Sequence, residues 1–354
     1  MDELEIVTRR LRRQRLAGEP FESAAEAVAF FGAVQSQDFA EAKWSLGERL
    51  REVSDSDLDA AFDAGEILRT HVLRPTWHFV TPEDIGWMLE LTAPRVHAAL
   101  GSAYRRLELD DRDFTLGHET IGAALAGGDP LIRTELVEAL RAAGVGGERL
   151  RQLHVIIHAE LERLICSGPR RGKQHTYTLL AERAPAARRL TPDAALAELT
   201  RRYFTSHGPA TANDFAWWSG LTLAEARRGL ELAGEQVSDA RLGADDAWYD
   251  APGAAPNDPV EDAFLIGMFD ESVIAYQDLR YAFAHRPVAL DPLIRPIVIG
   301  GRTVGTWRRV LDRGAAIVGA SPFGSLAAAE AAALEACVAR LGRFLGIETR
   351  LAIV

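Results

Sequence analysis

Apolar residues in the first 65 positions are spaced as on one face of a helix, and capping residues divide them into short segments. This pattern predicts helices at 8–17, 24–31, 42–51 and 55–64, with Thr8 capping the first. Two short strands, 67–73 and 76–80, are predicted around the Arg74–Pro75 turn. The sequence Thr81–Pro82–Glu83–Asp84 then has the cap, proline and acids of a helix N-terminus.

The order of helices followed by a hairpin recurs twice. Helices are predicted at 116–125, 134–143 and 148–165, followed by a loop at 168–172 and a strand at 175–180. A third set has helices at 192–204, 211–218 and 222–233, then strands at 236–241 and 247–250. Three helices and a hairpin are the order of a winged helix, in which 148–165 would be the recognition helix and 168–172 the wing tip.

Beyond a linker at 251–259, strands are predicted at 294–299, 303–310, 315–318 and 349–354, with a long helix at 325–345. The Gly300–Gly301 pair predicts a tight hairpin. We therefore expect a helix-rich α+β fold with four domains. They are three winged-helix units, at 1–110, 111–190 and 191–258, and a β-rich domain at 259–354.

Composition is that of an ordinary globular protein, with 47% hydrophobic and 26% charged residues among 354. A membrane span, a secretory leader and a disulfide framework are not expected, because no long apolar run is present and Cys166 and Cys337 stand alone. A reducing cytoplasm is the expected location.

Net charge is −11, which by itself argues against a nucleic-acid partner. The distribution changes this picture. The segment 163–189 carries seven basic residues and one acid, whereas 203–282 carries four basic and fourteen acidic residues. Local potential steers a phosphate backbone, so the basic stripe keeps DNA among the expected partners.

Five segments in this order resemble the AlkZ/YcaQ-like winged-helix DNA glycosylases: 33–38, 73–80, 163–180, 264–276 and 301–309. The resemblance covers nearly the whole chain. It implies three tandem winged-helix units in a C-shaped arrangement with a C-terminal β-barrel-like domain. It also implies an enzyme that removes bulky or N7-alkylated purines from double-stranded damaged DNA, and it leaves open whether interstrand crosslinks are unhooked. We expect a monomer without a cofactor.

The family's catalytic Gln-x-Gln motif matches Gln35–Ser36–Gln37. In this interpretation both amides, in a non-helical turn, hold the attacking water without titrating. The residues alone are also compatible with a helix C-terminus bearing two exposed glutamines. The adjacent Asp38 is either a carboxylate that activates water or a solvated Asx-turn residue.

Other candidates are weaker. Arg74, Trp77 and His78 could line the lesion site, although Trp77 and His78 could equally be structural residues of a strand. Arg170, Arg171 and Lys173 at the predicted wing tip are candidate phosphate contacts, or else a solvated loop.

For three further features the sequence predicts no function. Two acids at the tip of the third predicted wing, 243–246, would repel phosphates. The i, i+4 pair His154 and His158 lacks a third ligand, so no metal is expected. Lys43 and Lys173 are the only lysines; Lys43 is placed on a solvated helix face. With no activated amine, we expect hydrolysis by water.

These features predict a monofunctional DNA glycosylase. The alternative is a winged-helix DNA-binding or transcription regulatory protein without catalysis, for which the C-terminal helix could serve as a dimerisation element. Base release from alkylated DNA distinguishes the two.

Overall fold

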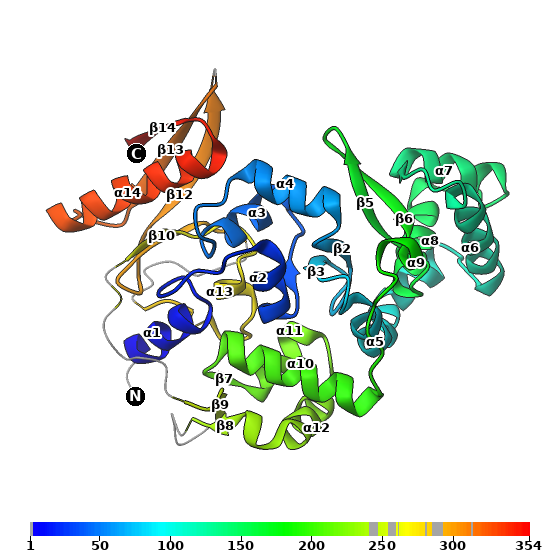
Figure 1. Cartoon of the computed structure of the whole chain (residues 1–354), viewed down its shortest axis with the longest axis horizontal. Coiled ribbons are helices and arrows are strands. Elements are labelled where there is room, and N and C mark those ends of the chain that lie inside the picture. The colour runs from blue at the N-terminus through cyan, green and yellow to red at the C-terminus, as the bar shows by residue number, and fades with distance from the viewer. Residues whose placement is uncertain are drawn as a thin grey trace. The chain divides into compact units, whose positions relative to one another are not determined.

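The structure is a computed structural model, and it describes residues 3–240, 247–253, 260, 262–279, 282–284, 293–312 and 314–354 (Figure 1). The chain forms two compact units. Unit 1 contains residues 1–59, 197–218 and 222–354, and unit 2 contains residues 60–196 and 219–221. The described residues form three small sheets and one larger C-terminal sheet.

Unit 1 is built mainly from short helices with polar caps. They are α1 (Glu3–Arg13), α2 (Ala24–Phe31), α3 (Phe39–Gly47), α10 (Pro192–His207), α11 (Ala212–Ser219), α12 (Leu223–Ala233) and α13 (Glu271–Ile274). Ser23 caps α2, and Thr222 with Glu225 forms the predicted capping box of α12. Helix α4 (Asp55–Ala64) is divided between the two units, and unit 2 also includes the first residues of α10 and the last residue of α11.

The C-terminal part of unit 1 is a five-stranded sheet that curls into a half-barrel (Figure 1). Its strands, in spatial order, are β10 (Ala263–Leu265), β11 (Pro296–Ile299), β12 (Arg302–Asp312), β13 (Ala315–Pro322) and β14 (Glu348–Ile353). Helix α14 (Ala328–Leu345) connects β13 to its parallel neighbour β14. Because β10 and β14 have no further strand beside them among the described residues, the expected barrel-like domain is only half a barrel.

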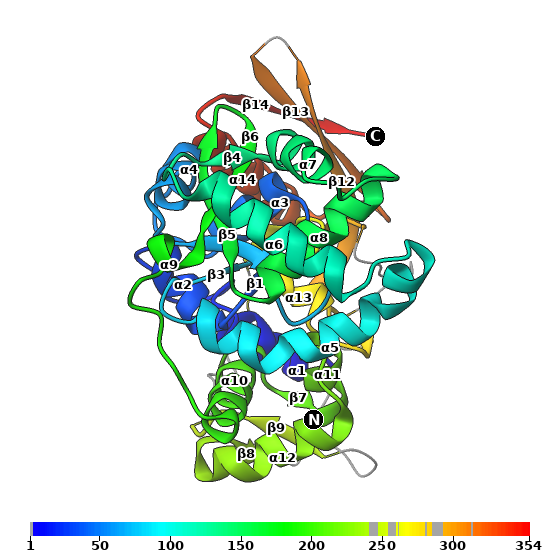
Figure 2. The same cartoon turned by 90° about the vertical axis from the view of Figure 1, so that its right-hand side faces the viewer.

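Unit 2 begins with a hairpin of β2 (Leu68–His71) and β3 (Trp77–Val80), as predicted, followed by the long helix α5 (Ile85–Arg106). Three helices then pack against one another (Figure 2): α6 (Asp111–Leu125), α7 (Arg133–Ala142) and α8 (Arg149–Leu161). Their apolar faces enclose a core that includes Ile121, Leu136 and Val155.

A small sheet completes this set of helices. It is formed by β4 (Leu131–Ile132), β6 (Gln174–Leu179) and β5 (Ile165–Arg171), in that spatial order, and α9 (Leu180–Arg183) follows. The predicted order of three helices and a hairpin is therefore present. It recurs at α10–α12, whose sheet has the equivalent spatial order β7 (Ala210–Thr211), β9 (Trp248–Asp250) and β8 (Ser238–Asp239).

Several predicted boundaries were wrong. Helix α1 begins at Glu3, so Thr8 lies inside the helix and does not cap it. Helix α8 ends at Leu161 because the chain turns into a left-handed conformation at Arg163 (φ 62°). The predicted tip of the third wing, 243–246, lies outside the described residues.

The predicted wing loop at 168–172 is mostly strand. Strand β5 continues to Arg171, which pairs with Gln174, so only Gly172 and Lys173 form the turn. Pro169 suggested a loop, but it lies at an irregularity in the register, where a missing backbone N–H is tolerated. Arg170 and Arg171 are consequently strand residues.

In the described part of the chain, no helix combines the length and apolar character needed to cross a membrane.

Candidate functional site

The Gln35–Ser36–Gln37 motif lies in unit 1, between α2 and α3. Gln35 ends the two-residue strand β1 (Val34–Gln35), and the next two residues are irregular. The motif is therefore non-helical, and the alternative of a helix C-terminus with two exposed glutamines was wrong. Gln35 is buried at 6% exposure and Ser36 is fully buried, whereas Gln37 is exposed. The motif thus has one buried glutamine and one that reaches the surface.

A buried carboxylate holds the backbone of this motif. The N–H of Gln35 donates to Oε1 of Glu271 at 2.7 Å. The other oxygen of Glu271 accepts from the indole of Trp218 at 2.9 Å, and Nε2 of His207 lies 3.4 Å from it. Burial lowers the pKa of His207, against the opposing effect of Glu271. Glu271 was not a sequence candidate, although it lies within the 264–276 segment of the family resemblance.

The residue before Glu271 belongs to a buried ion pair. Arg49 donates to both oxygens of Asp270, at 2.8 and 2.9 Å, and both side chains are 1% exposed. Burial raises the pKa of Asp270, but the Arg49 guanidinium outweighs it and holds the pKa at about 2. This bidentate pair fixes the start of α13, and with it Glu271 beside the glutamine motif.

Asp38 acts as a helix cap. Its Oδ1 accepts from the N–H groups of Ala40 and Glu41, at 3.0 and 3.1 Å, so it caps α3. This geometry matches the local interpretation of Asp38 as an Asx-type residue, and a role of its carboxylate toward water stays a prediction.

The other lesion-site candidates, Arg74, Trp77 and His78, lie on or beside the β2–β3 hairpin of unit 2. Their surroundings differ. His78 is fully buried and bonds the carbonyl of Thr76 through Nδ1, and burial lowers its pKa well below the usual range. It is a neutral structural histidine. Arg74 is half-buried beside the turn. Trp77 lines a pocket.

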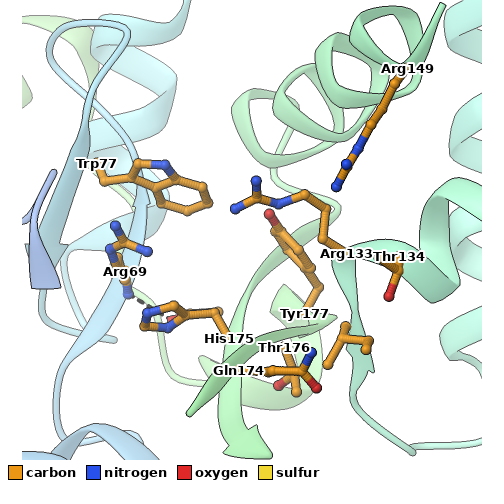
Figure 3. A pocket seen from close by; sticks show the side chains of 11 residues that line it. Arg69, Trp77, Arg133, Thr134, Arg149, Gln174, His175, Thr176 and Tyr177 are labelled. Carbon is orange, nitrogen blue, oxygen red and sulfur yellow. Dashed lines mark hydrogen bonds between the residues drawn. The ribbon is translucent and has the colours of Figure 1, made fainter.

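That pocket is a cavity of about 200 Å³ within unit 2 (Figure 3). Trp77 forms one wall, with the Arg69 guanidinium 4.3 Å from its ring centre and His71 at 4.0 Å. Behind it, Nδ1 of His71 lies 2.5 Å from Glu160, a fully buried carboxylate. The lining residues are Arg69, Trp77, Ile132, Arg133, Thr134, Arg149, Ser167, Gln174, His175, Thr176 and Tyr177.

Two helix N-termini face this pocket. Arg133 is the first residue of α7 and Arg149 the first of α8, and both are exposed with their guanidinium groups directed into the cavity (Figure 3). Exposed N–H groups and the helix dipole favour anions at such ends. Burial lowers the pKa of His175 to about 4, with nearby arginines adding to the effect, so it is neutral. The pocket therefore combines cationic groups with an aromatic wall.

Sequence analysis missed these arginines. Arg133 and Arg149 lie outside the basic stripe, and the only signal that could have found them is an arginine at the start of each of two helices in one unit. The predicted phosphate contacts are differently placed: Arg170 pairs with Asp63, and Arg171 lies 2.6 Å from Glu135. Lys173 is exposed at the turn.

Lys43 does not lie on a solvated helix face, as expected from the sequence. Its side chain is 5% exposed, and Nζ lies 2.8 Å from Asp55 and 2.5 Å from Asp59. Helix α4 brings both carboxylates back onto α3. The amine of Lys43 is therefore enclosed by two carboxylates and is not open to solvent.

Comparison with known proteins places this geometry in a family. The model for "DNA glycosylase AlkZ-like" matches residues 28–344, which include the glutamine motif, Glu271 and the pocket. This chain belongs to the AlkZ-like DNA glycosylases. The interstrand DNA cross-link repair glycosylase of Streptomyces sahachiroi is 26% identical over 320 residues, covering 85% of this chain and 86% of that protein.

The solved structure of Streptomyces sahachiroi DNA glycosylase AlkZ has the same fold. It superposes with a TM-score of 0.80 at 24% identity, over 100% of both chains. The AlkZ-like chain described here is therefore a DNA glycosylase by family, with a helix-rich α+β fold that ends in a half-barrel sheet.

Proposed function

We propose that this AlkZ-like chain is a monofunctional glycosylase that hydrolyses the N-glycosidic bond of bulky or N7-alkylated purines in DNA. We include crosslinked purines, because the Streptomyces relative is named as an interstrand cross-link repair glycosylase. The observation that carries the proposal is the non-helical Gln35–Ser36–Gln37 segment, fixed at Gln35 by the buried Glu271. Its three helix–hairpin segments are proposed to be winged-helix units.

The chemistry needs little acid assistance. N7-alkylation makes the guanine cationic, so the base is already a good leaving group, and the enzyme has to position water and stabilise positive charge on the sugar. Amide oxygens can accept from water and face positive charge without changing protonation. In this proposal Gln37 contacts the water directly, and Gln35, held by its backbone, completes the site.

The pocket of unit 2 is proposed to bind the DNA backbone. Arg69, Arg133 and Arg149 would repel a cationic alkylated base but attract a phosphate, and two helix N-termini face the same space. Trp77 offers an aromatic surface for a sugar or an unstacked base. The pocket would then position DNA while the reaction takes place at the glutamine motif.

Base release from a duplex containing one N7-methylguanine tests the proposal. The full chain is expected to leave an abasic site, revealed by strand cleavage only after heating in alkali. A duplex with ordinary guanine at that position is the control. Binding to both duplexes with no base release would favour the regulatory alternative and contradict catalysis.

Borohydride trapping tests the monofunctional part. Because Lys43 is buried between Asp55 and Asp59, no covalent protein–DNA adduct is expected on a duplex that the enzyme cleaves. An adduct that disappears in Lys43→Gln would overturn both the hydrolytic assignment and the role of the two glutamines.

A further inference from the structure

Unit 2 contains a cluster of imidazole and carboxylate groups that the proposed glycosylase chemistry does not use. It lies where the C-terminal end of α8 packs against α5. His97, His158 and Glu162 each offer one ligand atom, and these atoms lie within 4.8 Å of one another. His97 comes from α5, His158 from the last turn of α8 and Glu162 from the position that ends α8. Among the described residues, this is the group identified as able to hold a metal ion.

Two ligand atoms of the cluster already lie at nearly the distance that separates two ligands of one zinc ion. Nε2 of His97 lies 3.0 Å from Oε1 of Glu162. Zinc binds imidazole nitrogen and carboxylate oxygen at about 2.1 Å, so tetrahedral ligands lie about 3.4 Å apart. An ion can therefore replace the hydrogen between these two atoms with little movement. Glu162 is exposed and can rotate to follow the ion.

In His97 and His158, the ring nitrogen that would not bind the metal already has a hydrogen-bond partner. Nδ1 of His97 lies 3.1 Å from the hydroxyl of Tyr104, which can donate or accept and so serves either tautomer. Nδ1 of His158 lies 3.0 Å from Nε2 of His118. If Nδ1 of His158 donates there, its Nε2 carries the lone pair that binds a metal. Such outer partners fix the tautomer and orientation of liganding histidines.

A neighbouring aromatic ring holds the His158 imidazole in place. The His158 ring stacks on Phe114 with centroids 3.9 Å apart and an angle of 18°. The site is also at the C-terminal end of α8, where the helix dipole favours a cation.

We propose that His97, His158 and Glu162 form a binding site for a divalent first-row transition ion, zinc above all, with water in the fourth position. The donor set of two imidazoles and one carboxylate is one that zinc uses. His118 acts as a positioning residue through Nδ1 of His158. The bound ion links α5 to the end of α8 and stabilises unit 2.

Titration of the untagged, chelator-treated full chain with Zn²⁺ tests this site. Calorimetry is expected to show one saturable site, and Co²⁺ to give the visible absorption of a four-coordinate ion. His97→Ala and Glu162→Gln are each expected to weaken Zn²⁺ binding at least about tenfold and to remove the cobalt band. His118→Ala is expected to weaken binding by about 10–100-fold.

His154→Ala is the matched control, because His154 lies one turn earlier on α8 and bonds the carbonyl of Leu150 outside the cluster. It is expected to bind Zn²⁺ like the wild type. Thermal unfolding checks that each variant folds, and Zn²⁺ is expected to raise Tm in the wild type and in His154→Ala only. Absence of a saturable site, or equal affinity in Glu162→Gln and wild type, would overturn the proposal.

Discussion

The glutamine motif of unit 1 and the pocket of unit 2 use charge in opposite ways. Around Gln35 the charges are buried: Arg49 is bound to Asp270, and Glu271 accepts hydrogen bonds from the backbone of Gln35 and the indole of Trp218. In the pocket, Arg133 and Arg149 are exposed and directed into open space (Figure 3). The first arrangement fixes the backbone of the glutamine motif, and the second attracts a polyanion.

This difference suggests that the glutamine motif and the pocket have separate roles. Fixed, internally neutralised groups are suited to positioning water against a developing charge, because they need no rearrangement during the reaction. Exposed cations bind phosphate through counterion release but contribute nothing specific to bond cleavage. Substitutions in unit 1 should therefore change stability or rate, and those in unit 2 should change affinity and its dependence on salt.

The largest effect is expected at the Arg49–Asp270 pair. Asp270→Asn leaves the buried Arg49 without its counter-charge, which should cost about 3–5 kcal/mol of unfolding free energy. Urea unfolding measures this, with Glu348→Gln, in an exposed pair with Arg350, as a control expected to change nothing.

The same pair predicts the sign of the acid dependence. The folded pKa of Asp270 is about 2, below the usual value of about 3.9 in an unfolded chain. Its stabilisation is complete above pH 4 and is lost as the pH falls from there toward 2. Wild type should therefore lose more stability than Asp270→Asn over this interval. Parallel losses would show that the pair does not anchor α13.

The next largest effect concerns catalysis. Gln37→Ala should slow base excision by about 10–1000-fold, since one positioning group is lost, while affinity for undamaged duplex stays unchanged. Single-turnover excision measures the rate, and the exposed Gln236→Ala of unit 1 is the matched control. Excision at the wild-type rate would place the active site elsewhere.

A smaller effect, on binding alone, is expected in the pocket. Arg133→Ala with Arg149→Ala should weaken affinity for every duplex and reduce the slope of log affinity against log salt by up to about 1.8, which is about 0.9 for each phosphate contact. The excision rate at saturation should not change. Arg112→Ala, an exposed arginine of α6 outside this pocket, controls for loss of charge. An unchanged slope would contradict a phosphate role.

The smallest effect is expected from the β5–β6 hairpin of unit 2. Replacing Arg170, Arg171 and Lys173 together by Ala should reduce the salt slope by no more than about 0.9, because Asp63 and Glu135 already neutralise the two arginines. Comparing the salt slopes of this variant and the pocket variant shows which of the two surfaces makes more phosphate contacts. A larger loss here than in the pocket would reverse the comparison.

Much of the fold was predictable because it depends on local patterns. Helical spacing, caps and the Gly300–Gly301 turn were sufficient for the order of helices and hairpins, and errors lay mainly at boundaries, as at Thr8 and Arg163. The glutamine motif was found through its resemblance to a family and its local sequence. Its catalytic role, and those of the other predicted site residues, stay predictions.

The sequence by itself determined which groups are present: two glutamines in a non-helical segment, arginines in excess over lysines, and helices with their caps. Only the tertiary structure decided which charges are neutralised. Lys43 is paired because α4 folds back onto α3, and Arg171 because Glu135 lies beside its strand. Arg133 and Arg149 remain open to the cavity, and His158 meets His97 across two helices. Such pairings depend on distances of a few ångströms between residues far apart in the chain, and local sequence patterns do not encode those distances.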